Sequence, residues 1–431
     1  MRSFAFLLLC AVANAQSPKN YKDHGEYDLY NEVAKDFAAN NSSKALTDLE
    51  RWSEKYPESE FNEDRQLLYV QAYSGVNQMP KALDAAGPIL AKDQPANSAS
   101  VLRLLYAAVS AIQRVPDPSA PQVATATKAA QLLEKYDTPP EGVSPAVWES
   151  TRAELRSTAH ATLLYIAILP ASRATKAKDC PGAEAAALKA METFPESVQA
   201  AWYLATAEVC LTKSDPAKAS FALYELARAA ALDPVKGMVD NKWQQTTVIP
   251  YLERAYQQFH GTDPQGLKDL KATALESPLP PAGFVIKSSA EIDRLNQLEF
   301  ESKHPELALW MKIKTALAAA DGVHYFETEL KDSAVPPLQG IVVEAKPECR
   351  PTELRIAIAA PTDAQNPRPE VLLKLEKPLP GKPESASEIH WTGIAKAFSQ
   401  EPFLLTMEVE TSKVEGVKLA PCQPALTRRK P

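Results

Sequence analysis

Glycine is scarce in this sequence, with 14 residues among 431, whereas proline is abundant at 36. The glycine-rich phosphate loops of nucleotide enzymes, GxGxxG and GxxxxGK[S/T], do not occur. A basic excess is also missing, because 54 Asp and Glu outnumber 47 Lys and Arg. Nucleic acids and anionic membranes attract a positive field, so the composition argues against both as partners. Apolar residues still make up 45% of the chain, which is enough to bury sizeable cores.

Sequence frames for catalysis and metal binding are absent as well. No two of the six histidines lie within ten residues of each other, and neither HExxH nor GxSxG occurs. We therefore expect no catalytic residue, no metal and no cofactor, and a protein that is not an enzyme. A secreted hydrolase whose site is assembled from distant residues remains the alternative.

The N-terminus has the features of a secretory signal peptide. Arg2 precedes an apolar run from Phe4 to Val12, and Ala13 and Ala15 fit a small-x-small cleavage pattern. The sequence predicts that residues 1–15 are removed and that the protein is exported, to the periplasm or outside the cell. Elsewhere no apolar run reaches about 18 residues, so we expect no integral membrane segment in the mature chain.

Four cysteines remain after this cleavage: Cys180, Cys210, Cys349 and Cys422. An even number in an oxidising compartment favours two disulfides, for which three connectivities exist. We favour Cys180–Cys210 and Cys349–Cys422, because each pair then stays within one expected domain. Free thiols remain the alternative for Cys180 and Cys210.

A short motif recurs in the first two thirds of the chain. It places Ala, then an apolar residue four positions on, another three further on, and a Pro five after that. The clearest copies begin at Ala45, Ala183 and Ala222 and end at prolines, and looser copies begin at Ala82 and Ala129. Each copy predicts a short amphipathic helix ended by proline.

A second kind of helix precedes these copies. Its large and small residues recur at spacings of 0, 3, 4 and 7, which puts them on one helical face. The quartets are Tyr69, Ala72, Tyr73 and Val76; Leu102, Leu105, Tyr106 and Val109; and Trp202, Ala205, Thr206 and Val209. A longer helix is expected from Ala146 to Leu169. Because neither kind of helix buries its apolar stripe alone, the pattern indicates stacked helix pairs over residues 20–277.

These paired patterns resemble the tetratricopeptide repeat (TPR). The copies are degenerate, because their starts lie 37 to 54 residues apart against about 34 in the family, and the family glycine is replaced. A non-repetitive helical domain is the alternative. The resemblance implies a groove for a protein or peptide partner, with candidate groove residues Tyr69, Val70, Ser74, Tyr203 and Ala207. In stacked hairpins, Cys180 and Cys210 would also lie at the same end.

A different pattern follows the helical region. Residues 278–322 read as a proline-rich linker and helical connector, with Leu307, Trp310, Ile313 and Leu317 on one packing stripe. Over residues 323–425 the apolar period changes to two, which predicts a small antiparallel β-barrel or sandwich. The expected strands carry Ile341, Val343 and Ala345; Leu354, Ile356 and Ile358; Val371, Leu373 and Leu375; Ile389 and Trp391; and Phe403, Leu405, Met407 and Val409. Gly340 and Gly393 resemble the glycine-bent strands of an OB-fold barrel.

The fold class expected is therefore α+β, with a helical TPR-like array before a β-domain. The leading hypothesis is an exported, non-catalytic scaffold that binds a protein through its TPR-like groove. The alternative places binding of a ligand or glycan on the OB-like β-domain. The sequence leaves the partner, the oligomeric state and the domain that carries function undetermined, because both folds host many functions.

Overall fold

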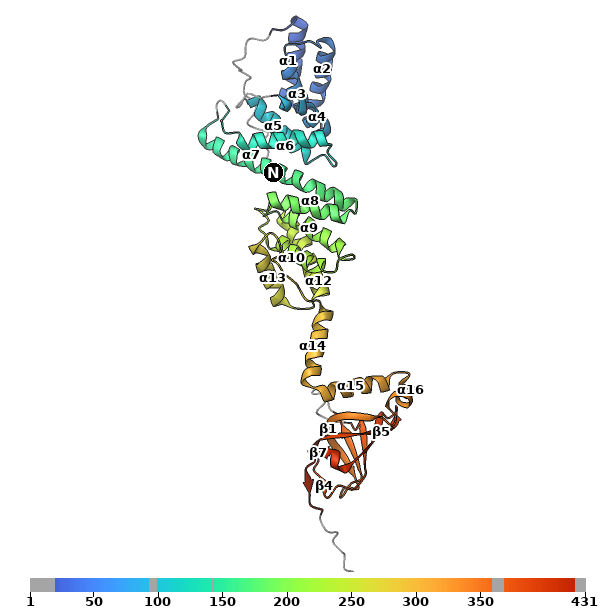
Figure 1. The fold of residues 1–431 in the computed structure, drawn as a ribbon. Coiled ribbons are helices and arrows are strands. Elements are labelled where there is room, and N and C mark those ends of the chain that lie inside the picture. Colours follow the sequence, from blue (N-terminus) through green and yellow to red (C-terminus); the bar gives the residue numbers. More distant parts are fainter. Residues whose placement is uncertain (1–19, 93–98, 141–142, 359–367, 423–431) are drawn as a thin grey trace, which may run out of the picture. The chain divides into compact units, whose positions relative to one another are not determined.

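The computed structural model describes residues 20–92, 99–140, 143–358 and 368–422 (Figure 1). The expected signal peptide, residues 1–15, lies outside the described residues. The chain divides into two compact units, Met1–Lys287 and Ser288–Pro431. The first unit is helical and the second joins helices to a small β-barrel. The α+β fold class is confirmed.

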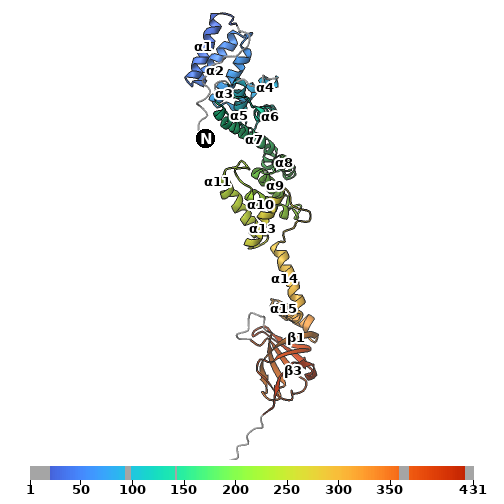
Figure 2. The same ribbon diagram turned by 90° about the vertical axis from the view of Figure 1, so that its left-hand side faces the viewer.

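The helical unit is a succession of helix pairs in chain order (Figures 1 and 2). The pairs are α1 His24–Ala38 with α2 Ser42–Lys55; α3 Asn62–Gly75 with α4 Met79–Ala91; α5 Ala99–Ile112 with α6 Ala120–Lys135; α7 Pro145–Lys176 with α8 Cys180–Thr193; and α9 Val198–Leu211 with α10 Lys218–Ala231. A final pair consists of α11 Asn241–Trp243, the π-helical turn η1 Gln244–Val248 and α12 Ile249–Phe259, followed by α13 Pro264–Glu276.

Contacts between these helices follow the order of a TPR-like repeat. In the first five pairs each second helix packs against its own first helix and against the first helix of the next pair, whereas α13 packs on α10. The first helices α3, α5, α7 and α9 also touch one another in turn. All five copies of the sequence motif fall within second helices, and three of these helices end two or three residues before Pro57, Pro195 and Pro234. The motif therefore predicted the second helices, because in its clearest copies an apolar stripe is followed by a proline that ends the helix.

Helix α7 is longer than the sequence indicated. It runs from Pro145 to Lys176 and contains Pro170, where the expected helix ended at Leu169. Proline removes one intrahelical hydrogen bond, but Pro170 faces solvent while Leu169 and Ala171 are buried on either side of it. The buried neighbours hold the helix in place.

The proline-rich segment after α13 packs onto the helical unit. The backbone N–H of Ile286 donates to Ser220 Oγ at 3.0 Å, and the ring of Phe284 meets Tyr224 edge-on at 5.1 Å. These contacts pack residues 284–286 against α10.

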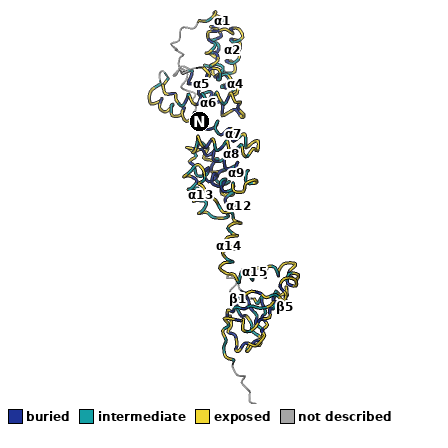
Figure 3. Tube along the Cα trace, in the orientation of Figure 1, coloured by how far each residue is buried: buried dark blue, intermediate teal, exposed yellow. Residues whose placement is uncertain are grey.

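Three helices precede the barrel in the second unit: α14 Ser289–Lys303, α15 Pro305–Ala318 and α16 Gly322–Tyr325, the last extended by the π turn η2 Phe326–Leu330. Helix α14 has no buried residue (Figure 3). Helix α15 buries Trp310, Ile313 and Leu317 in the barrel core, as the stripe predicted. Trp310 Nε1 also donates to Glu370 Oε2 at 2.9 Å.

Five strands close the barrel in the order β1-β2-β3-β6-β5, with β5 pairing back to β1. They are β1 Ala334–Lys346, β2 Glu353–Ala357, β3 Val371–Leu375, β5 Glu388–Ser399 and β6 Leu404–Val409. These pairings are antiparallel except β3–β6, which is parallel. Short strands β4 Lys382–Pro383, β7 Val414–Glu415 and β8 Leu419–Ala420 lie outside this ring. A closed five-stranded barrel of this kind is OB-like.

Two glycines allow the barrel to close. A Cβ atom on Gly340 would lie 2.5 Å from Ile356 Cγ2, and one on Gly393 would lie 2.7 Å from the Glu408 carbonyl oxygen. Any side chain at either position would push neighbouring strands apart. The glycine-bent strands expected from the sequence therefore lie at close approaches between strands.

In the first strand the alternating apolar residues Ile341, Val343 and Ala345 are not the buried ones. Val335, Leu338 and Val342 are buried in the barrel, whereas Val343 is 40% exposed. Gly340 occupies an inward position without contributing an apolar side chain, and the β1–β2 register shifts between Val342 and Glu344. Because of these two features, the buried residues of β1 do not form a regular alternating row of apolar side chains in the sequence.

Candidate functional site

The candidate groove residues divide into buried and half-exposed positions. Val70 and Ala207 are only 2% and 3% exposed, so their prediction as groove residues was wrong. Val70 packs in the core with Leu83 and Leu105, because α3 turns that side toward α4 and α5.

Two other candidate groove residues on α3, Tyr69 and Ser74, are half-exposed, but their hydroxyl groups contact other groups of the helical unit. Tyr69 lies 3.0 Å from Ser53 Oγ through its hydroxyl, and its ring stacks on Tyr73 at 5.8 Å. The Ser74 hydroxyl donates to the Val70 carbonyl at 2.7 Å. Ser74 is therefore satisfied within its own helix, and Tyr69 presents one partly open ring.

Tyr203 is half-buried and belongs to a larger set of aromatic side chains on first helices. Trp202, its neighbour on α9, meets Trp243 of α11 edge-on at 5.8 Å and Tyr251 of α12 at 5.3 Å. On α7, burial raises the pKa of Tyr165, with charged neighbours and Tyr203 nearby. These five half-buried rings form two groups: Trp202 with Trp243 and Tyr251, and Tyr203 near Tyr165. We refer to the two groups together as the aromatic face.

The π turn η1 aligns two rings of this face. Trp243 and Tyr251 are eight residues apart, which in an uninterrupted α-helix would rotate them about 80° from each other. A π turn absorbs one residue, so the two rings lie on one side and both reach Trp202. Buried Gln244 at the start of the turn donates to the carbonyls of Ala229 and Leu232, at 2.9 and 2.8 Å. It thereby satisfies the C-terminal end of α10.

Arg228 of α10 holds the elements behind this face together. Its guanidinium donates to the carbonyls of Ala274 and Ser277, at 2.7 and 2.9 Å, and to that of Pro195 at 2.7 Å. Arg228 is 4% exposed; its bond to the Ala274 carbonyl is buried, and its bonds to the Ser277 and Pro195 carbonyls are partly buried. One side chain thus ties α10 to the end of α13 and to the loop before α9.

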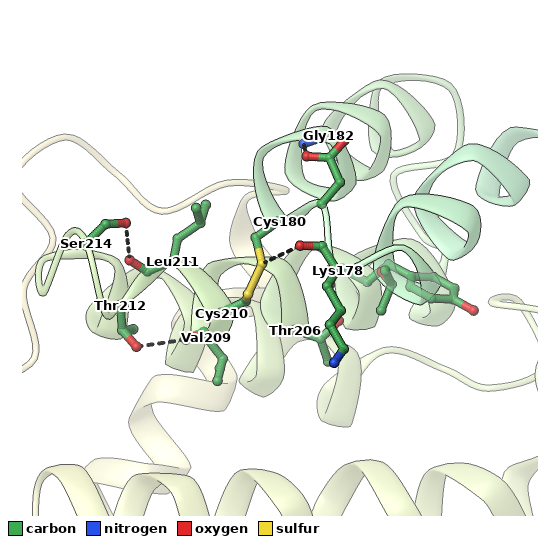
Figure 4. Close-up of a disulfide and its surroundings, with 12 residues drawn as sticks. Lys178, Cys180, Gly182, Thr206, Val209, Cys210, Leu211, Thr212 and Ser214 are labelled. Carbon is green, nitrogen blue, oxygen red and sulfur yellow. Dashed lines mark hydrogen bonds between the residues drawn. A yellow bond between two sulfur atoms is a disulfide. The ribbon is translucent and has the colours of Figure 1, made fainter.

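A disulfide joins α8 to α9 beside the same region (Figure 4). Cys180 begins α8, Cys210 lies one residue before the end of α9, and their Cα atoms are 6.0 Å apart. In the barrel unit Cys349 is bonded to Cys422, with 5.8 Å between Cα atoms. Both Cα separations lie in the usual disulfide range, and both expected pairs are joined.

A hollow of about 560 Å³ lies on the barrel between β1, β3, β5 and β6. Ile394 is exposed beside it, and Lys374, Glu408, Glu410 and Lys413 bring charges of both signs. Lys413 pairs with Glu410 at 3.0 Å. A hollow with an apolar side chain and mixed charges suits a polar ligand with some apolar surface.

Neither a metal-binding cluster nor a membrane-crossing helix occurs among the residues that the structure describes. They contain no cluster of three or more His, Cys, Asp or Glu side chains arranged to bind a metal ion. Among the same residues, no helix combines the length and the apolar character that a membrane crossing requires.

The sequence alone did not identify most of the aromatic face. Trp243 and Tyr251 lie in the helical segment that follows the last motif copy. Without the π turn, their spacing of eight residues does not place them on the same side of a helix. Tyr165 lies inside the long α7, outside any quartet. The run of aromatic residues on consecutive first helices was the available signal.

Comparison with known proteins gives limited information. No protein-family model and no curated protein matches the chain. Among solved structures, it is similar to the TPR2AB domain of yeast Sti1 in its complex with pHSP90, at 14% identity and a TM-score of 0.17. That match covers 54% of this chain and 97% of the other. The TPR-like character of the helical unit rests on its own helix order and contacts.

Proposed function

We propose that this protein is an exported, non-catalytic scaffold that binds a protein or peptide partner on the aromatic face. The observation that carries the proposal is the aromatic face itself, five half-buried rings on consecutive first helices of a TPR-like unit. Rigid aromatic side chains are the residues that most often dominate binding energy at protein interfaces. The face has no formal charge of its own, so we expect it to take an apolar or aromatic segment of the partner.

The expected N-terminal signal and the two cysteine pairs support the exported part of the proposal. Disulfides persist mainly in oxidising compartments. Cys210 is exposed, so a reducing cytosol would have access to its bond.

A photo-crosslinking amino acid at position 203 tests the proposal in the full-length protein. Position 189 on α8 is the matched control, because Lys189 is exposed on a second helix of the same unit. We expect one defined crosslinked protein from position 203 and none from position 189. Equal labelling from both positions, or none from either, would remove the aromatic face as the binding surface.

A second candidate function is favoured by the hollow on the barrel. Its volume of about 560 Å³ is in the range of small-ligand sites. A glycan or other polar ligand would contact Ile394 and the surrounding charges there. Adding oligosaccharides to the full-length protein and following chemical shifts of the barrel discriminates the two: saturable shifts around Ile394 would move function to the second unit.

A further inference from the structure

Two glutamates inside the helical unit have buried carboxyl oxygens with no hydrogen-bond partner among the described residues. Glu225 of α10 is 0% exposed, and neither of its carboxyl oxygens has a partner. Glu208 of α9 is 6% exposed, and its Oε2 has none. The neighbours of Glu225 along α10, Tyr224 and Leu226, belong to the apolar core that α10 shares with α12 and α13. An ionised carboxylate is costly in such surroundings unless it is paired.

Both cations near this pair also bind other groups, and Lys218 is itself within ion-pair distance of Glu208. Lys218 forms an ion pair with Glu184 of α8, and its ammonium lies 4.0 Å from Glu208 Oε1. Arg228 directs both terminal nitrogens of its guanidinium to backbone carbonyls rather than to Glu225. The titratable and charged groups that face the pair are Glu184, Asp215, Lys218, Tyr224 and Arg228.

Burial therefore favours the neutral form of both carboxyls. Burial raises the pKa of Glu225 to about 9; Glu208 adds to the rise, and Arg228 opposes it. Burial also raises the pKa of Glu208 to about 8, against the attraction of Lys218 and with the support of Glu184. Both side chains carry protons in the folded unit at neutral pH.

We propose that Glu208 and Glu225 form a proton-operated latch, which keeps α9 packed on α10 while both carboxyls are protonated and loosens this interface as the protons leave. The inference concerns the packing of the helical unit and does not depend on the proposed function. Since α9 also carries Trp202 and Tyr203, the latch sets how firmly the aromatic face is held.

The pH range of the latch follows from linkage. When α9 and α10 separate, water solvates the carboxyls and their pKa returns to the ordinary 4.5. Opening then releases protons between pH 4.5 and the folded pKa values of about 8 and 9. The stabilisation is fully present below pH 4.5 and is lost as pH rises through this range. For each group, the opening constant rises about tenfold per pH unit and levels off above its folded pKa.

Hydrogen exchange of the full-length protein measures this opening constant. The amides of α9 and α10 are followed from about pH 5.5 to 8, after correction for the intrinsic exchange rate. We expect the logarithm of the opening constant to rise by about two per pH unit in the wild type, since two protons are released. The amides of α1 and α2, away from the pair, provide the internal reference with no such slope.

Variants assign the slope to the two carboxyls. Gln keeps the volume of Glu and cannot ionise, so Glu225→Gln and Glu208→Gln should each lower the slope by about one, and the double variant should abolish it. Glu253→Gln, at an exposed position of α12, should leave the slope unchanged. A wild-type slope near zero would overturn the latch without any variant, as would a slope that survives in the double variant.

Discussion

Removing the Cys180–Cys210 disulfide should measurably destabilise the helical unit. The bond closes a loop with a sequence separation of 30 residues between α8 and α9. For such a loop the chain-entropy model gives about 12 cal/mol/K, or about 3.7 kcal/mol at 25 °C. Serine suits both positions because Cys180 is half-exposed and Cys210 exposed, so a hydroxyl there meets water.

The double variant Cys180→Ser/Cys210→Ser is compared with the wild type by urea unfolding, followed by far-ultraviolet circular dichroism of the helices. With an m-value of about 3 kcal/mol/M, the midpoint of the helical transition should fall by about 1.2 M. Cys349→Ser/Cys422→Ser is the matched control, because that bond lies in the barrel unit and should leave the helical transition in place.

Thiol counting on the natively exported protein precedes the comparison. We expect no reactive thiol in denaturant until a reductant is added. An unchanged helical midpoint in a variant whose parent is fully oxidised would refute the loop-closure reasoning, and free thiols in the parent would refute the pairing itself.

Substitutions at three further positions test contacts within the helical unit and within the barrel unit. Arg228→Ala leaves one buried and two partly buried carbonyls without their donor and should cost about 3 to 5 kcal/mol of helical-unit stability, while Arg228→Lys should recover only part of it, both measured by urea unfolding. Trp310→Ala removes a side chain that is 1% exposed together with its bond to Glu370, and should cost the barrel about 3 to 5 kcal/mol by thermal unfolding. Gly393→Val places methyl groups against the carbonyl of Glu408, so the near-ultraviolet signal of the barrel tryptophans should be lost; a native signal would contradict the close approach.

The sequence predicted the second helices of the array well because two independent signals coincide there. An apolar stripe defines the buried side, and a proline marks the end of the helix at Pro57, Pro195 and Pro234. The exposed side of the first helices was harder to predict, because α3 and α9 pack against several neighbouring helices. A family register therefore assigned Val70 and Ala207 to an open face although both are buried.

The buried charges were beyond sequence reasoning for a different reason. Glu225 stands at the i+3 position of the motif that begins at Ala222, on the same face as Leu226 and Ala229. The sequence thus shows a glutamate within an apolar stripe. Whether this glutamate has a cationic partner depends on which groups the Arg228 guanidinium binds. That direction is set by the end of α13, which lies about 50 residues further along the chain.

In the barrel, the strands with uninterrupted alternation were predicted in the correct phase. Leu354, Ile356, Val371 and Leu373 all point into the core. In β1 the sequence pattern selected Ile341 and Val343, whereas Val342 is buried. Gly340 leaves a gap in the inward row of side chains, and a register shift follows it. Local patterns therefore sufficed where one face is continuously apolar, and failed where a glycine or a bulge interrupts it.

The affinity of the partner captured at position 203 for the full-length protein tests the central claim most directly. Wild type, Tyr203→Ala and the control Lys189→Ala are compared by calorimetry, with circular dichroism to confirm that each is folded. The proposal predicts that Tyr203→Ala weakens binding at least tenfold, about 1.4 kcal/mol, and that Lys189→Ala binds like the wild type. Equal affinity of all three proteins would contradict it.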